Sequence, residues 1–141
     1  MIILLSPAKS LDLDSPCPEE TSVPRFERQA AKIARAAQSL DADDLKQIMG
    51  ISDKLAEENA ERYRRFFKND TRPAIRSFAG DVYRGFDIAS CESDVVDYAQ
   101  HHVRILSGLY GMLKPKDRMR PYRLDMGTRW SPEKGAEGKL N

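Results

Sequence analysis

The stretch Ile48–Tyr63, IMGISDKLAEENAERY, joins two helical segments through a single glycine. Upstream of it, the acidic run that starts at Asp41 suits the cap and first turn of a helix. Gly50 can end that helix in a left-handed conformation, and Ser52 is a good N-cap for the next helix. Residues 43–66 are therefore expected to form two helices joined by a tight turn.

This turn has two interpretations. One is a plain helical hairpin. The other is a helix-hairpin-helix element, whose backbone N–H groups bind a DNA phosphate without reading the bases. Ser52 departs from the second pattern, which prefers glycine there, and acids such as Asp53, Glu57, Glu58 and Glu61 are unfavourable near DNA. The residues that would contact DNA are Gly50, Ile51, Ser52, Lys54, Arg62 and Arg65.

Composition indicates an ordinary globular chain: 141 residues, 40% hydrophobic, 32% charged and a net charge of +1. Residues 101–141 carry nine Lys/Arg against four Asp/Glu, so a basic end permits an anionic partner without requiring one. The apolar start, MIILL, is too short to span a membrane and lacks signal-peptide features. With two cysteines far apart, the expectation is a cytoplasmic protein without membrane association.

The other segments predict a mixture of helices and strands. Met1–Leu5 is typical of a buried strand, and Arg25–Leu40 of an amphipathic helix. Ala74–Phe86 reads as a strand or an irregular segment, and Ser93–Val103 as a helix capped by Ser93. Arg104–Pro115 fits a continuing helix or a strand entering a glycine-rich turn, and the strand is favoured. The expected fold class is α+β, with a mixed sheet, flanking helices and the helix-hairpin-helix element.

A second constellation is expected near the carboxyl ends of two strands, where ligands bind in α/β sheets. Lys9 and Ser107 would follow such strands, and Tyr110, Tyr122, Arg123 and Asp125 would line the same pocket, suited to a phosphate, nucleotide or base. Asp81, in the GDVYRG segment, is a candidate acid or base. The alternative is structural: a tight turn, Arg123–Asp125 ion pairs and a turn carboxylate. His101 and His102 are adjacent and would point apart. No metal, cofactor or catalytic residue is predicted.

Four blocks occur in order along the chain: LLSPAKSLD, ISDKLAEENAERY, FAGDVYRGF and LSGLYGMLKPKDRMRPYRLDMG. Together they resemble the YaaA-type peroxide stress resistance family, from Met1 to about Arg129. The resemblance implies cytoplasmic proteins that bind DNA, lower free intracellular iron and so limit oxidative damage. It implies an α+β fold with the helix-hairpin-helix element at Leu45–Arg65.

Family members are considerably longer, so residues 1–141 are expected to form one domain that is the N-terminal part of a longer fold. The SPEKGAEGKLN ending resembles a loop cut mid-way. The leading hypothesis is sequence-independent binding of duplex or structured DNA, with a binding role favoured over catalysis. The rival is an α/β enzyme or binding domain acting on a nucleotide or nucleobase through Lys9, Ser107, Tyr110 and Arg123.

Overall fold

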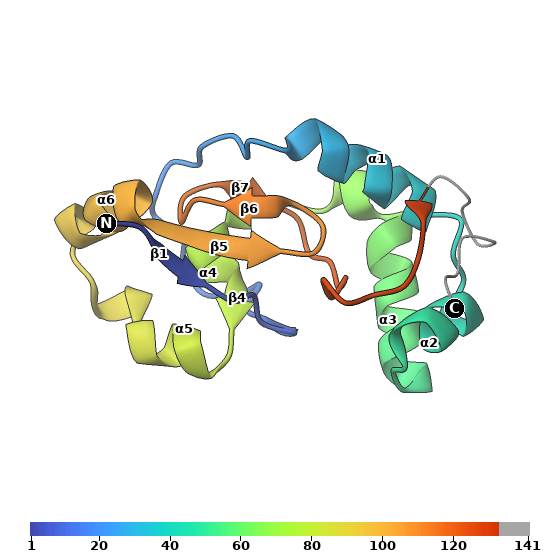
Figure 1. The fold of residues 1–141 in the computed structure, drawn as a ribbon. Coiled ribbons are helices and arrows are strands. Elements are labelled where there is room, and N and C mark those ends of the chain that lie inside the picture. The colour runs from blue at the N-terminus through green and yellow to red at the C-terminus, as the bar shows by residue number, and fades with distance from the viewer. Residues whose placement is uncertain (133–141) are drawn as a thin grey trace.

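The computed structural model of the protein describes residues 1–132. At its centre lies a mixed sheet with the strand order β1–β5–β6, formed by Ile3–Leu5, Val103–Ser107 and Gly111–Leu113 (Figure 1). β1 runs parallel to β5, and β5 and β6 form an antiparallel hairpin. The α+β class is confirmed, and so is the strand expected after Arg104.

Two short antiparallel pairs tie distant segments to this sheet. β2 pairs with β4, and β3 pairs with β7. Both pairs use residues 72–79, so this central segment is bound to the chain that follows β1 and to the chain that follows β6. The four strands are Ser10–Leu11, Arg72–Pro73, Phe78–Ala79 and Arg118–Met119 in chain order.

The helices form two groups on either side of the sheet (Figure 1). One group holds α1, α2, α3 and the short 3₁₀ helix η1, which span Glu27–Ala37, Ala42–Met49, Asp53–Arg64 and Phe66–Lys68. The other holds α5, the 3₁₀ helix η2 and α6, which span Asp81–Phe86, Ile88–Ser90 and Ser93–His102. One further turn of helix, α4 (Ala74–Ser77), links β3 to β4.

The hydrophobic core runs continuously from the sheet into the first helical group. α1 contributes only alanines to its fully buried face, which lets the helix axis approach its neighbours closely. Larger side chains fill the space beneath; those with almost no exposed surface include Leu45, Tyr63, Ile75, Ile105, Leu113 and Met119. The two halves of the molecule therefore share one core within the described residues.

Three expectations from the sequence are corrected. Met1–Leu5 does contain a strand, but it is largely exposed, because β1 lies at the edge of the sheet. Ala74–Phe86, expected as a strand or an irregular segment, holds two short helices on either side of β4. These helices are too short to show the repeat of apolar residues that marks a helix in a sequence. The N-cap of α6 is Glu92, one residue before Ser93. Most of the SPEKGAEGKLN segment lies outside the described residues.

Candidate functional site

The turn at Gly50 has the local structure that its residues predict. α2 begins with a reciprocal capping box, in which the side chains of Asp41 and Asp44 accept each other's backbone N–H groups. Gly50 ends α2 at φ +63°, and its N–H donates to the carbonyl of Lys46. The Ser52 hydroxyl then accepts the Leu55 N–H at 3.3 Å and caps α3. The start of α2, the end of α2 and the start of α3 are thus each capped by hydrogen bonds to residues close by in the sequence.

The same turn separates an apolar anchor from an exposed start of helix. Ile51 is only 7% exposed and belongs to the core, whereas Gly50, Ser52 and Lys54 are exposed. The backbone N–H groups in the first turn of a helix have no intrahelical acceptor, so those of residues 53 and 54 are available to a ligand. Lys46 pairs with Asp53 at 2.7 Å, which fixes α2 against α3 across the turn.

The charges around the turn are mixed. Arg62 donates to the carboxylate of Glu58 at 2.9 Å and to the side-chain oxygen of Asn59 at 3.3 Å, while Arg65 is exposed. Residues 41–65 contain seven Asp/Glu and five Lys/Arg. This segment therefore supplies directed N–H groups and exposed cations, but its own net charge is negative.

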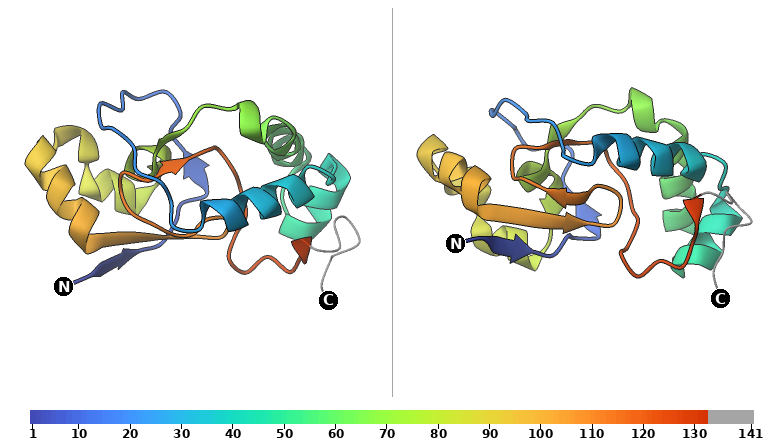
Figure 2. Two further views of the ribbon diagram at one scale, coloured as in Figure 1. Left: turned by 90° about the horizontal axis from the view of Figure 1, so that it is seen from above. Right: turned by 45° about the horizontal axis from the view of Figure 1, so that its top comes forward.

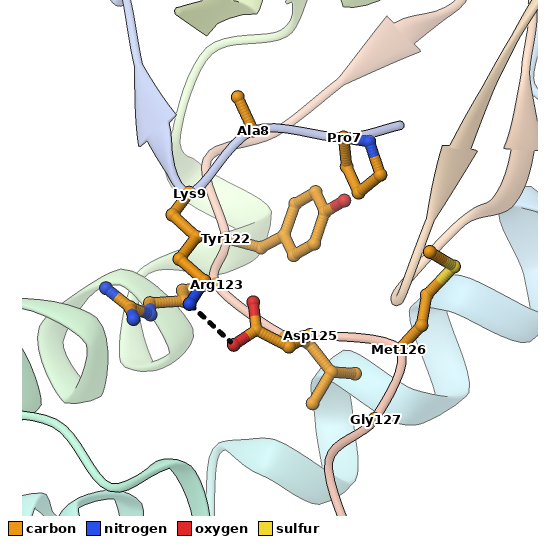
Figure 3. Close-up of a pocket in the computed structure, with 9 residues that line it drawn as sticks. Pro7, Ala8, Lys9, Tyr122, Arg123, Asp125, Met126 and Gly127 are labelled. Atoms are coloured by element: carbon orange, nitrogen blue, oxygen red, sulfur yellow. Dashed lines mark ion pairs between the residues drawn. The ribbon is translucent and has the colours of Figure 1, made fainter. Parts of the chain in front are cut away.

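The second candidate site is a cavity of about 320 Å³ beyond the carboxyl end of β1. It lies between Pro7–Lys9 and Tyr122–Gly127 (Figure 3). The ammonium nitrogen of Lys9 is 4.0 Å from a carboxylate oxygen of Asp125, and both side chains remain accessible, at 70% and 39% exposure. Arg123 extends away from Asp125 (Figure 3), and its Nε is buried without a hydrogen-bond partner among the described residues.

Three contacts hold the loop that carries Arg123 and Asp125. The hydroxyl groups of Ser107 and Tyr122 are 2.5 Å apart, and the Tyr63 hydroxyl donates to the Arg123 carbonyl at 2.7 Å. Gly108 lies so close that an added Cβ would be 1.8 Å from the carbonyl oxygen of Leu124. Burial raises the pKa of both tyrosines, so their hydroxyl groups stay protonated and act as neutral hydrogen-bonding groups.

The structure brings together only part of the predicted pocket. Lys9, Tyr122, Arg123 and Asp125 line one cavity, and Ser107 is buried behind Tyr122 with its oxygen also accepting the N–H of residue 110. The remaining two candidates lie elsewhere. Tyr110 borders a different cavity, of about 360 Å³, and its hydroxyl accepts the backbone N–H of residue 120. Asp81 starts α5, where its exposed carboxylate pairs with Arg84.

The structure also has a basic surface on α1 that was not predicted from the sequence. α1 presents Arg28, Lys32 and Arg35 on its exposed side, and exposed Arg25 comes directly before the helix. At about 100° per residue, the three helical cations fall within about 60° of arc, opposite the buried alanines. The single acid of α1, Glu27, lies outside this arc and pairs with Arg118. The i, i+4, i+7 spacing of like charges was the signal available in the sequence.

Aromatic groups border this basic face of α1. The guanidinium of Arg35 lies 5.1 Å from the ring centre of Phe67, which is 40% exposed. Phe67, Tyr110, Arg118 and Arg120 line the cavity of about 360 Å³ beside α1. Figures 1 and 2 place α1 along the outside of the molecule, and in Figure 1 the turn between α2 and α3 lies at the end of α3 away from α1.

Within residues 1–132, no group of three His, Cys, Asp or Glu side chains is arranged to hold a metal ion. His102 instead stacks on Tyr98, with ring centres 4.1 Å apart. None of the helices in the same range has the length and apolar composition that crossing a bilayer requires.

Comparison with known proteins places the chain. Residues 1–139 match the family model described as "Peroxide stress protein YaaA". The chain belongs to the YaaA family of peroxide stress proteins. A UPF0246 protein of Rhizorhabdus wittichii is 55% identical over 133 residues, covering 94% of this chain and 53% of its own length. UPF0246 proteins of Polynucleobacter necessarius and Ruegeria pomeroyi are 46% and 45% identical, covering 99% and 96% of this chain.

The chain spans about half the length of these YaaA-family relatives, which are matched over 53–55% of their own residues. The match to the family model, over residues 1–139, covers all the residues that the structure describes. It includes the Gly50 turn, the central sheet and the cavity beside Lys9.

Proposed function

We propose that this YaaA-family chain binds DNA without sequence preference and serves in defence against hydrogen peroxide. The observation that carries the proposal is the Gly50 turn. A glycine at positive φ is followed by an exposed helix start, whose first N–H groups have no intrahelical acceptor, and by exposed Lys54. Such groups suit a phosphate oxygen, and contact with phosphate ignores base identity.

Charge supports the same function from a second surface. Because residues 41–65 are net negative, the turn alone attracts a polyanion weakly. Arg28, Lys32 and Arg35 on α1 supply the positive field that sequence-independent binding needs. α3 separates the two surfaces by about 18 Å of helix rise.

The test is salt-titrated binding of two unrelated duplexes by fluorescence anisotropy. Log K should fall by about 0.9 per phosphate neutralised for each tenfold rise in salt, equally for both sequences. Two variants should weaken binding. One is the double variant that combines Gly50→Val with Lys54→Ala, and the other is the single variant Lys54→Glu, which leaves the backbone of the turn unchanged. Lys114→Ala is the control, since it removes an exposed cation that directly follows β6, outside both candidate DNA-binding surfaces.

The outcomes separate the claims. If the wild-type chain binds neither duplex at low salt, the DNA-binding proposal is wrong. If both turn variants bind as tightly as the control, the role of the turn is wrong. Circular dichroism of the double variant checks its fold, because valine is strained at the positive φ of residue 50.

Family membership further supports a cellular role in limiting free iron, which would reduce iron-dependent oxidation of DNA. Cells that express the chain should show less chelatable iron after peroxide treatment than cells expressing an unrelated protein. Electron paramagnetic resonance of chelated iron measures this. Equal iron signals in the two cultures would remove this part of the proposal and leave DNA binding to be judged on its own test.

A second candidate function belongs to the cavity beside Lys9. Its specific support is the buried Nε of Arg123, which has no hydrogen-bond partner within residues 1–132, together with the accessible Lys9 and Asp125 around about 320 Å³ of space. Two cations, one carboxylate and the Tyr122 ring suit a nucleotide or nucleobase. AMP, ADP and adenine should raise the melting temperature of the wild-type chain. Arg123→Ala should abolish the shift; a shift that survives in this variant would reject the assignment.

A further inference from the structure

β1 is an edge strand with an unusual composition. In the described sheet it pairs with β5 along one side only, in the register Ile3 to Val103 and Leu5 to Ile105. Edge strands of globular proteins are usually protected by charges, proline or bulges, since their free N–H and C=O groups invite pairing. The sequence Met1–Leu5 has none of these and is apolar at every position.

The side chains of β1 are exposed on both faces of the sheet. Ile3 and Leu4 point to opposite faces because successive residues of a strand alternate, yet they are 41% and 60% exposed. Ile2 is 55% exposed. Continuous apolar runs of this kind are typical of strands buried on both faces, not of edges. The view from above in Figure 2 shows β1 at the margin of the molecule.

The exposed surface continues onto α6. The His102 ring contacts the Met1 carbonyl at 3.0 Å and stacks on Tyr98, which is 58% exposed. Val95, one turn earlier on α6, is also exposed. Together, Met1–Leu4, Val95 and Tyr98 form one apolar patch, which we call the β1 patch. Contiguous exposed apolar surface of this kind marks an interaction site.

The lengths of the YaaA-family relatives indicate what covers the β1 patch. They are matched over only 53–55% of their own residues, so nearly half of each relative lies outside the matched region. We propose that this unmatched half docks on the β1 patch, adding a strand to the free edge of β1 and apolar side chains over Ile2, Leu4 and Tyr98. The inference is independent of DNA binding.

Hydrogen exchange by NMR tests this pairing by comparing this chain with the full-length relative from Rhizorhabdus wittichii. The amides of β1 that point away from β5 should exchange rapidly in this chain. At the aligned positions of the full-length relative, they should exchange slower by about 100-fold or more. Equally fast exchange in the two proteins overturns the proposal.

A substitution gives a second readout. Leu4→Lys should leave the thermal stability of this chain nearly unchanged, because the side chain is already exposed. The same change at the aligned position of the relative should lower its melting temperature markedly, since it would bury an unpaired charge. Equal effects in both proteins contradict the proposal. So does a dimer of this chain with protected β1 amides, because that would assign the patch to a second copy.

Discussion

At the scale of single residues, two glycines illustrate different requirements. Gly50 adopts φ +63° with no atom within 4 Å of an added Cβ, so the constraint is backbone conformation. Gly108 has no such conformation, but an added Cβ would meet the Leu124 carbonyl oxygen at 1.8 Å. Gly50→Ala should cost about 1–2 kcal/mol of unfolding free energy. Gly108→Ala should cost about 3 kcal/mol or more, because backbone must move.

Urea denaturation of the two variants measures these costs. The Gly108 variant should also lose any nucleotide-dependent thermal shift, because its collision displaces the loop that carries Arg123 and Asp125. The Gly50 variant should retain that shift. A Gly108→Ala protein as stable as the Gly50→Ala protein would show that the loop relaxes freely and that the close approach is not a constraint.

Tyr63 links the helical hairpin to the second candidate site. Its ring is 1% exposed, and its hydroxyl donates to the Arg123 carbonyl at 2.7 Å. Tyr63→Phe keeps the ring but leaves that carbonyl without this donor, at a cost of about 1–3 kcal/mol. Urea denaturation checks the value. Tyr98→Phe provides the control, since its exposed ring should tolerate the same chemical change with little loss of unfolding free energy. Equal stabilities of the two variants would contradict the structural role of the Tyr63 hydroxyl.

At the scale of elements, local signals predicted local structure well. Asp41, Gly50 and Ser52 mark helix ends through their own side chains or backbone, so α2 and α3 could be located from sequence. Two apolar runs marked the strands β1 and β5, but their parallel pairing joins segments far apart in the sequence and came from the structure alone. The contact of Tyr63 with residue 123 and of Gly108 with residue 124 depends on how distant segments pack, which no local pattern encodes. The exposure of β1 depends on what covers it, and its apolar composition alone suggested burial.

α1 carries an element-scale prediction. Its exposed face holds Arg28, Lys32 and Arg35, opposite the buried alanines, so changing all three to Gln should cost no more than about 1 kcal/mol of stability, mainly through loss of the Arg35 contact with Phe67. If these cations contact phosphates, the triple variant should bind duplex DNA more weakly. The slope of log K against log salt should shrink by up to about 0.9 for each cation that contacts a phosphate.

The same anisotropy titration that tests the Gly50 turn measures this slope. A matched control removes exposed cations elsewhere, as in Arg84→Gln with Lys114→Gln. An unchanged slope in the α1 variant, together with a reduced slope in Lys54→Glu, would assign the phosphate contacts to the turn alone. The reverse pattern would assign them to α1.

At the scale of the whole molecule, residues 14–24 cross the surface with little regular structure and are held by side chains from later in the chain. Glu19 accepts hydrogen bonds from Arg76, and both side chains are nearly buried, at 11% and 10% exposure. The Ser22 hydroxyl donates to Asp117 at 2.6 Å. Just beyond, Glu27 pairs with Arg118 at 2.8 Å. These contacts join the first 27 residues to the part of the chain that follows residue 71.

This arrangement predicts loss of stability in acid. Burial acts to raise the pKa of Glu19, but hydrogen bonds and positive charge from Arg76 outweigh it, so the pKa lies below its ordinary 4.5. Hydrogen bonding to Arg118 likewise lowers the pKa of Glu27. Because a depressed pKa favours the folded state only while the group is ionised, this stabilisation is present above about pH 4.5 and is lost as pH falls through the lower, folded-state pKa.

Urea denaturation from pH 7 to pH 3 should show this decline in the free energy of unfolding. Glu19→Gln should flatten it and lower stability at pH 7, whereas Glu20→Gln, the same change at an exposed neighbour, should follow the wild-type curve. If Glu19→Gln and Glu20→Gln give superimposable curves, the Glu19–Arg76 pair does not stabilise the fold.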